Sequence, residues 1–120
     1  MTFSNNGKND IHKLFIDTID GIDIILKDNI CYVEYDLGLT KIYLADGKVY
    51  TLYKTLKDVV GSLDESTFVQ ISRNVVINAL FVTRIINKNN TTFIKMSEPK
   101  DVILRCTRYN VKQLKDILQY

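Results

Sequence analysis

The chain has 120 residues, of which 46% are apolar and 25% are charged, and its formal net charge is +2. These values exclude a disordered tail and fit one domain that is long enough to bury its own core. No apolar run approaches the roughly 20 residues that cross a bilayer, and the polar first ten residues lack the apolar stretch of a signal peptide. We therefore expect a cytoplasmic protein with a polar arm over 1–11 and one domain over 12–120.

The first half of the chain is predicted to be rich in β-strand, because short apolar and β-branched runs alternate with turn residues. Two Asp-Gly pairs, Asp20-Gly21 and Asp46-Gly47, each favour a tight hairpin turn between two such runs. Strands are expected over 13–19, 22–26, 30–35, 40–44 and 48–53.

A short helix is predicted after these strands. Thr55 precedes Asp58 at the spacing of a helix-capping pair. Apolar residues then recur at helical spacing as far as Leu63, which gives the helix one apolar stripe to pack on a sheet.

The second half is less regular. The stretch 74–82 has no clean period, and a helical turn or corner at Asn78, whose side chain would bond the backbone, competes with a strand there. Asn110 with Gln113 indicates a cap for a last helix ending near Leu118. Further strands are expected over 82–87, 92–96 and 102–106. The elements together predict a mainly β, multi-stranded fold of several hairpins with two short helices, one of them C-terminal.

Positive charge is concentrated in the second half. Residues 1–60 hold seven lysines against nine acidic residues, whereas residues 61–120 hold four arginines and five lysines against five acidic residues. All four arginines lie between 73 and 108: Arg73, Arg84, Arg105 and Arg108. Since arginine suits bidentate recognition of phosphates and guanine edges, this distribution indicates a face for a polyanion, with random scatter over the surface as the alternative.

The sequence gives little reason to expect catalysis. It has no glycine-rich phosphate loop, and its one histidine, His12, has no partner that would make it a catalytic base. The two cysteines, Cys31 and Cys106, match no metal spacing and are expected to be free, buried thiols. We predict no enzyme activity, no metal and no cofactor.

Two motifs in this arrangement resemble the LytTR family, the DNA-binding output domains of many bacterial response regulators. The first is FVQISRNVVINALFVTRI over 68–85, which is similar to the family's Phe, Arg-Ile-His-Arg-Ser, Val-Asn and Ile pattern. The second is Cys106-Thr107-Arg108-Tyr109, which is similar to its Val-Ser-Arg-aromatic motif before the last helix. The resemblance covers 12–118.

The resemblance implies an elongated β fold that lies along DNA and inserts loops, not a helix, into the major groove. One contact would come from Arg73 and Asn74, and a second from Arg108 beside Tyr109. A third would come from the region around Thr40 and Lys41. The implied partner is double-stranded promoter DNA with repeated half-sites, hence a dimer on DNA, while a monomer in solution stays open.

The physical chemistry of the arginines agrees with this. Arg73 and Arg108 stand where an apolar run gives way to a turn, which holds a long cation while exposing its tip. The sequence also departs from the family, with Ser72 at the usual histidine and Asn74 at the usual serine, so a different target sequence is expected. Arg105 replaces a small or cyclic residue and is expected to add a phosphate contact.

Structural alternatives stand beside these assignments. Arg73 and Arg108 could instead brace the sheet through ion pairs with nearby acidic residues. Arg84 is balanced between a phosphate contact and a solvated face, and Lys112, like Lys115, is more typical of a solvated helix face than of a backbone contact. Five tyrosines fit sheet packing better than a base-stacking platform: Tyr32, Tyr35, Tyr43, Tyr50 and Tyr53.

A second function class is a β-rich interaction module that binds an acidic protein, single-stranded nucleic acid or a small ligand. Salt dependence separates the two classes. Binding to duplex DNA should weaken steeply with salt and keep its sequence preference under competitor DNA, and such a module would show neither property.

Overall fold

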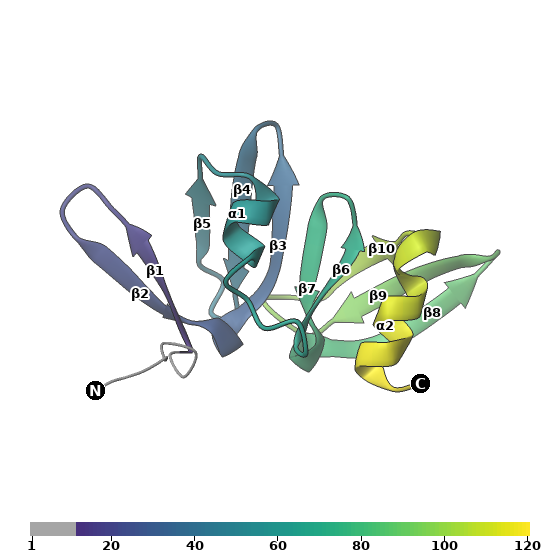
Figure 1. Ribbon diagram of the computed structural model, residues 1–120. Helices are drawn as coiled ribbons and strands as arrows, with labels where there is room; N and C mark the ends of the chain where they lie inside the picture. Colours follow the sequence, from purple (N-terminus) through teal and green to yellow (C-terminus); the bar gives the residue numbers. More distant parts are fainter. Residues whose placement is uncertain (1–11) are drawn as a thin grey trace.

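The computed structural model describes residues 12–120 as three antiparallel sheets in a row, with two short helices (Figure 1). The principal-axis extents are 49 × 30 × 23 Å, so the molecule is elongated. The predicted mainly β fold with two short helices is thereby confirmed. Neither helix in this part of the chain has the length and apolar character needed to cross a lipid bilayer.

The first sheet is the hairpin of β1 (Lys13–Asp17) and β2 (Ile22–Leu26). The expected two-residue turn at Asp20-Gly21 is wrong, because Asp17 pairs with Ile22 and the Thr18 N–H donates to the Gly21 carbonyl at 2.9 Å. The connection therefore has four residues, and the first strand ends two residues earlier than predicted.

The central sheet has five strands in the order β5-β4-β3-β7-β6. The strands predicted over 30–35, 40–44 and 48–53 are confirmed, as is the turn at Asp46-Gly47, where Gly47 adopts a φ of +93°. The bounds of the five strands are β3 (Ile30–Asp36), β4 (Leu39–Leu44), β5 (Val49–Leu52), β6 (Phe68–Ser72) and β7 (Val75–Asn78).

Strand β6 was not predicted, and over 74–82 a strand was left open beside a helical turn or corner at Asn78. Both occur there, because β7 is followed by a 3₁₀ turn over Ala79–Phe81. Every residue of β7 is buried, because this strand lies inside the sheet and the sheet is covered on both faces. A strand buried on both faces loses the alternation of apolar and polar residues that identifies strands in a sequence.

The third sheet consists of β8, β9 and β10, and its three strands were all predicted. Strand β9 lies in the middle, paired antiparallel with both neighbours. The bounds are β8 (Val82–Lys88), β9 (Thr91–Met96) and β10 (Val102–Cys106).

The two helices are α1 (Leu56–Val60) and α2 (Val111–Leu118). The predicted cap of α1 is confirmed, since the Thr55 hydroxyl accepts from the Asp58 N–H at 3.1 Å. The predicted cap of α2 is wrong. A 3₁₀ turn over Arg108–Asn110 precedes this helix, and the Asn110 amide instead donates to the Thr107 hydroxyl at 2.7 Å.

The central sheet separates two apolar cores. One core lies between this sheet, the β1–β2 hairpin and α1, and includes Ile16, Ile25 and Val59. The other lies between this sheet, the third sheet and α2, and includes Ile94 and Leu114. Cys31 and Cys106 belong to the second core as free, buried thiols, as predicted.

Asn78 closes a buried corner, as predicted. Its side-chain amide donates to the Ile30 carbonyl at 2.8 Å, and its side-chain oxygen accepts from the Leu80 N–H at 2.9 Å. The second bond caps a 3₁₀ turn over Ala79–Phe81 that leads into β8. One side chain therefore joins strand β3 to the start of the third sheet.

Candidate nucleic-acid interface

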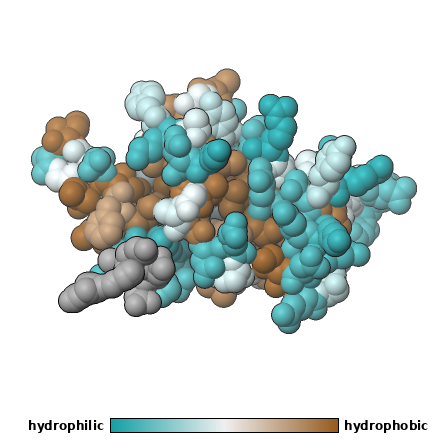
Figure 2. Space-filling view, in the orientation of Figure 1, coloured by the Kyte–Doolittle hydropathy of each residue, from teal (hydrophilic) through white to brown (hydrophobic). Residues whose placement is uncertain are grey.

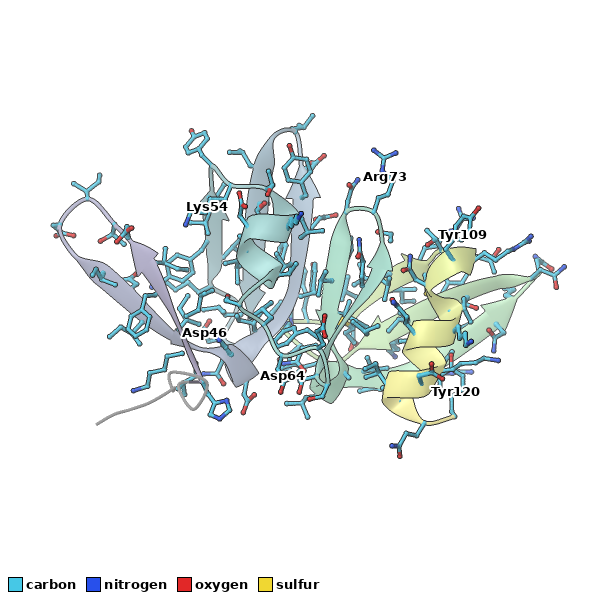
Figure 3. All side chains as sticks on the ribbon, in the orientation of Figure 1. Asp46, Lys54, Asp64, Arg73, Tyr109 and Tyr120 are labelled. Carbon is cyan, nitrogen blue, oxygen red and sulfur yellow. The ribbon has the colours of Figure 1, made fainter. Side chains whose placement is uncertain are left out.

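Three short turns lie at one edge of the molecule. They are the β3–β4 turn at Leu37-Gly38, the β6–β7 turn at Arg73-Asn74 and the 3₁₀ turn over Arg108–Asn110. Figure 3 shows Arg73 and Tyr109 pointing away from the molecule on the same side. We call these three turns together the three-turn edge.

Two backbone hydrogen bonds hold the turns beside one another. The Tyr35 N–H donates to the Asn74 carbonyl at 2.8 Å, which joins the end of β3 to the β6–β7 turn. The Thr107 N–H donates to the Ile71 carbonyl at 2.8 Å, which joins β6 to the residue before Arg108. The spacing of the turns is therefore set by backbone contacts and not by flexible side chains.

Arg73 and Asn74 form the whole tip of the second hairpin. Ser72 pairs with Val75, so only these two residues lie between the strands, and both are exposed. The Ser72 hydroxyl accepts from the Asn74 backbone N–H at 3.3 Å, and Asn74 itself is exposed. Serine in place of the family's histidine thus supports the turn from within.

Arg108 and Tyr109 are exposed on the third turn, with Tyr109 at 95%. Thr107 anchors this turn from below, since its hydroxyl donates to the Ile71 carbonyl at 3.3 Å and accepts from the Asn110 amide. Within residues 12–120 no hydrogen bond engages the guanidinium of Arg73 or Arg108. Both arginines are therefore available to a ligand, and neither braces the sheet by such a bond.

Thr40 and Lys41, expected to supply a third contact, do not lie at the tip of the β3–β4 hairpin. Thr40 is fully buried and its hydroxyl donates to the Lys54 carbonyl, so it has no atom to offer a ligand. Lys41 lies along β4 opposite Glu34, half-buried and away from the tip. The tip of this hairpin is instead Leu37, which is 91% exposed with a φ of +52°.

Leu37, at this tip, is not among the residues that the sequence pattern predicted for the interface. The glycine at position 38 is the sequence signal for a two-residue turn at Leu37-Gly38. In the structure Gly38 adopts a φ of +83°. Tyr53 was also misjudged, because it directly follows β5, whose Leu52 pairs with Thr40 near the same hairpin tip, and it is 92% exposed.

Comparison with known proteins agrees with this geometry. The model of the LytTr DNA-binding domain family matches residues 20–119, which is most of the chain. This chain belongs to the LytTR family. No curated protein sequence matches it.

A solved structure shares the fold. It is described as the LytTr DNA-binding domain of a methyl-accepting/DNA response regulator from Bacillus cereus. The match has a TM-score of 0.76 and 14% sequence identity, and it covers 92% of this chain and 99% of that one. The resemblance stated from the sequence is confirmed.

The other two arginines of this LytTR domain lie on the outer face of the third sheet. Arg84 on β8 and Ile103 on β10 both pair with Lys95 on β9, and Arg105 pairs with Phe93 one step along. Arg84 and Arg105 are exposed on this outer face of the third sheet. Arg105 lies at the β10 end that leads into Arg108, whereas Arg84 lies nearer the other end of the sheet.

Lys112 is exposed in the first turn of α2, directly after the third turn of the edge. Lys115, one turn later, lies over the Tyr120 ring with its ammonium 5.8 Å from the ring centre. The LytTR domain thus places Lys112 near the candidate interface and Lys115 against its own C-terminal residue.

Two of the tyrosines are packing residues, as predicted. The Tyr32 and Tyr43 rings stack with their centres 4.3 Å apart, and the Tyr43 hydroxyl donates to Glu34 at 3.4 Å. Burial, followed by the neighbouring Tyr43 and Glu34, raises the pKa of Tyr32 to about 12. These rings already have each other as stacking partners.

Proposed function

We propose that this LytTR domain binds double-stranded DNA in a sequence-specific way by inserting the three-turn edge into the major groove. The observation that supports the proposal best is the pair of backbone hydrogen bonds that fixes Arg73 and Arg108 on adjacent turns. These bonds fix the backbone positions of the two arginines relative to one another, so both guanidinium groups can reach the same stretch of base pairs.

Each turn is assigned a part in recognition. Arg73 and Arg108 would each form a bidentate contact to a guanine, worth about 1 to 3 kcal/mol against a wrong base. Asn74 suits adenine or a phosphate oxygen. Leu37, as an exposed apolar tip, suits the methyl group of thymine.

The remaining cations are assigned to the DNA backbone. Lys112 and Arg105 lie beside the third turn and would contact phosphates there, and Tyr109 would pack on the sugar-phosphate chain next to them. Such contacts orient a protein on the duplex without reading its sequence. Arg84, which lies farther along the outer face of the third sheet, would add a general attraction to DNA.

We also place the domain in the cytoplasm of a bacterium, as the output part of a two-component response regulator that acts on promoters. The family resemblance implies two repeated half-sites on the DNA. Footprinting on a selected site tests this, because two domains should protect two stretches of equal length. Protection of one stretch at saturating protein would contradict the half-site arrangement.

The direct test begins with a search for the target. Selection of binding sites from a random duplex pool with the purified chain should give one enriched motif, and recovery of no motif would contradict specific recognition. Titration of that duplex then compares wild type with Arg108→Ala and Arg73→Ala, each of which should weaken specific binding about tenfold or more.

Arg84→Ala is the matched control, because it removes the same charge from an exposed strand position. It should reduce binding to the selected duplex and to a random duplex by the same factor. Circular dichroism verifies that all three variants keep the fold. Unchanged affinity of both Arg73→Ala and Arg108→Ala for the selected duplex would show that the three-turn edge is not the reading surface.

A further inference from the structure

The outer face of the β1–β2 hairpin is an apolar surface that the DNA interface does not use. Alternate residues of the two strands point inward, where Ile16 and Ile25 are buried. The other face presents large apolar side chains that are each about half exposed: Phe15, Ile22, Ile24 and Leu26. Figure 2 shows apolar side chains gathered over this end of the molecule, which Figure 1 places opposite to α2.

We propose that this face is the interface between two copies of the chain, packed face to face about a twofold axis that crosses the strands. The proposal concerns a different surface from the three-turn edge and does not depend on the DNA contacts assigned above.

Charge favours the second copy as the occupant. Lys13 and Asp17 lie on the same outer face of β1, one at each end, with Phe15 midway between them. A twofold axis perpendicular to the strands reverses one β1 over the other, which brings each Lys13 over the Asp17 of the other copy and each Phe15 over its equivalent. The surface is therefore complementary to itself in both charge and shape.

The size of the surface is also sufficient. Covering four half-exposed apolar side chains together with Lys13 and Asp17 removes on the order of 500 Å² from each copy, or about 1,000 Å² in all, which is near the lower limit for a specific interface. Two sheets can stack in this way about 10 Å apart. We expect a reversible, weak dimer.

Sedimentation velocity of the full chain, without DNA, should show a monomer–dimer equilibrium at concentrations up to about 1 mM, the upper range for a weak association. Ile24→Lys should raise the dissociation constant about tenfold or more, because it places two ammonium groups at the centre of the interface. The matched control is Ile103→Lys, since Ile103 and Ile24 are both 58% exposed, and it should leave the dimer unchanged.

A charge exchange tests the orientation. Lys13→Asp alone and Asp17→Lys alone should each weaken self-association, because like charges then face one another at both ends. A mixture of the two variants should form a heterodimer, since every facing pair is again of opposite sign. A chain that stays monomeric over the whole range, or a mixture that associates no better than either variant alone, would overturn the proposal.

DNA binding separates this proposal from the previous one. Ile24→Lys should keep the affinity of one domain for a single half-site, because the hairpin face lies away from the three-turn edge. If the wild-type chain bound DNA but did not self-associate, only the proposed dimer interface would be overturned. If Arg108→Ala lost its base preference and still self-associated, both assignments would be supported.

Discussion

Asn78 is the residue on which two separate parts of the fold depend. Its side chain is fully buried and makes one hydrogen bond to β3 and one to the 3₁₀ turn before β8. Asn78→Ala leaves the Ile30 carbonyl and the Leu80 N–H without these partners, so we expect a loss of about 2 to 3 kcal/mol in the free energy of unfolding.

Urea denaturation followed by circular dichroism measures this loss. Asn87→Ala is a suitable control, because Asn87 is exposed and has one side-chain hydrogen bond, from Thr92 at 3.0 Å. We expect this control to lose less than about 1 kcal/mol. Equal losses in the two variants would show that burial of the Asn78 amide does not matter for stability.

Cys31 gives a prediction about pH. Burial is the largest cause that raises the pKa of its thiol from an ordinary value of 9.0 to about 11. Because the pKa is higher in the folded than in the unfolded chain, the protonated thiol contributes stability that is complete below about pH 9. That contribution is lost as the pH rises through 11.

Comparison with Cys31→Ala isolates this effect from the other groups that titrate at alkaline pH. The stability difference between wild type and Cys31→Ala, measured by urea denaturation, should be constant from pH 7 to 8.5 and should shift against wild type between about pH 9 and 11. A difference that does not change with pH would mean that the thiol titrates alike in the folded and unfolded chain.

At the scale of elements, the β3–β4 hairpin depends on the conformation of its turn. Gly38 has a φ of +83°, a conformation that side chains with a Cβ rarely adopt. Gly38→Ala should therefore lower the free energy of unfolding by about 1 kcal/mol.

Gly21→Ala is the matched control, because Gly21 lies in another hairpin loop and an added Cβ there would meet no atom within 4 Å. This change should be neutral or slightly stabilising. If Gly38→Ala proved as harmless as Gly21→Ala, the two-residue turn at Leu37-Gly38 would be the wrong description of this hairpin.

The strands that could be predicted from the sequence are those with one face more buried than the other. Strands β4 and β9 alternate between buried and half-buried residues, and both were found. Over β7 a strand could not be separated from a helical turn, because both faces of this strand are buried. The cap of α2 was misplaced because Asn110 bonds Thr107, a contact that exists only once Thr107 is anchored to β6.

The candidate site could be predicted only in part for the same reason. Arg73 and Arg108 stand in recognisable motifs, so a resemblance could identify them, and the structure brings their turns together. Thr40 was included because the family resemblance implied a contact from this region of the chain. Its burial depends on the pairing of β4 with β5 and on the carbonyl of Lys54, neither of which local sequence reveals.

At the scale of the whole molecule, positive charge lies on two surfaces with different expected effects. The outer face of the third sheet holds Arg84 and Lys95 side by side, away from the three turns. Arg84→Ala should reduce the slope of log affinity against log salt by about 1 if the residue neutralises one phosphate.

The reduction should be equal for the selected and for a random duplex, because a phosphate contact carries no base preference. Titrations at several salt concentrations with both duplexes measure it. If Arg84→Ala changed the ratio of the affinities for the two duplexes, Arg84 would contact bases and not only DNA phosphates.

Each turn of the three-turn edge is the end of an antiparallel ladder or is bonded to one, and the two residues at the β3–β4 tip, Leu37 and Gly38, are exposed. A strand advances about 3.3 Å per residue, so adding two residues to each strand of the β3–β4 hairpin would extend its tip by about 7 Å while keeping every side chain on its own face. Reach toward a groove can thus be adjusted in fixed increments without repacking the interior. A change in the length of this hairpin would therefore be a simple way to alter how far its tip reaches, whether in a relative or in a redesigned domain.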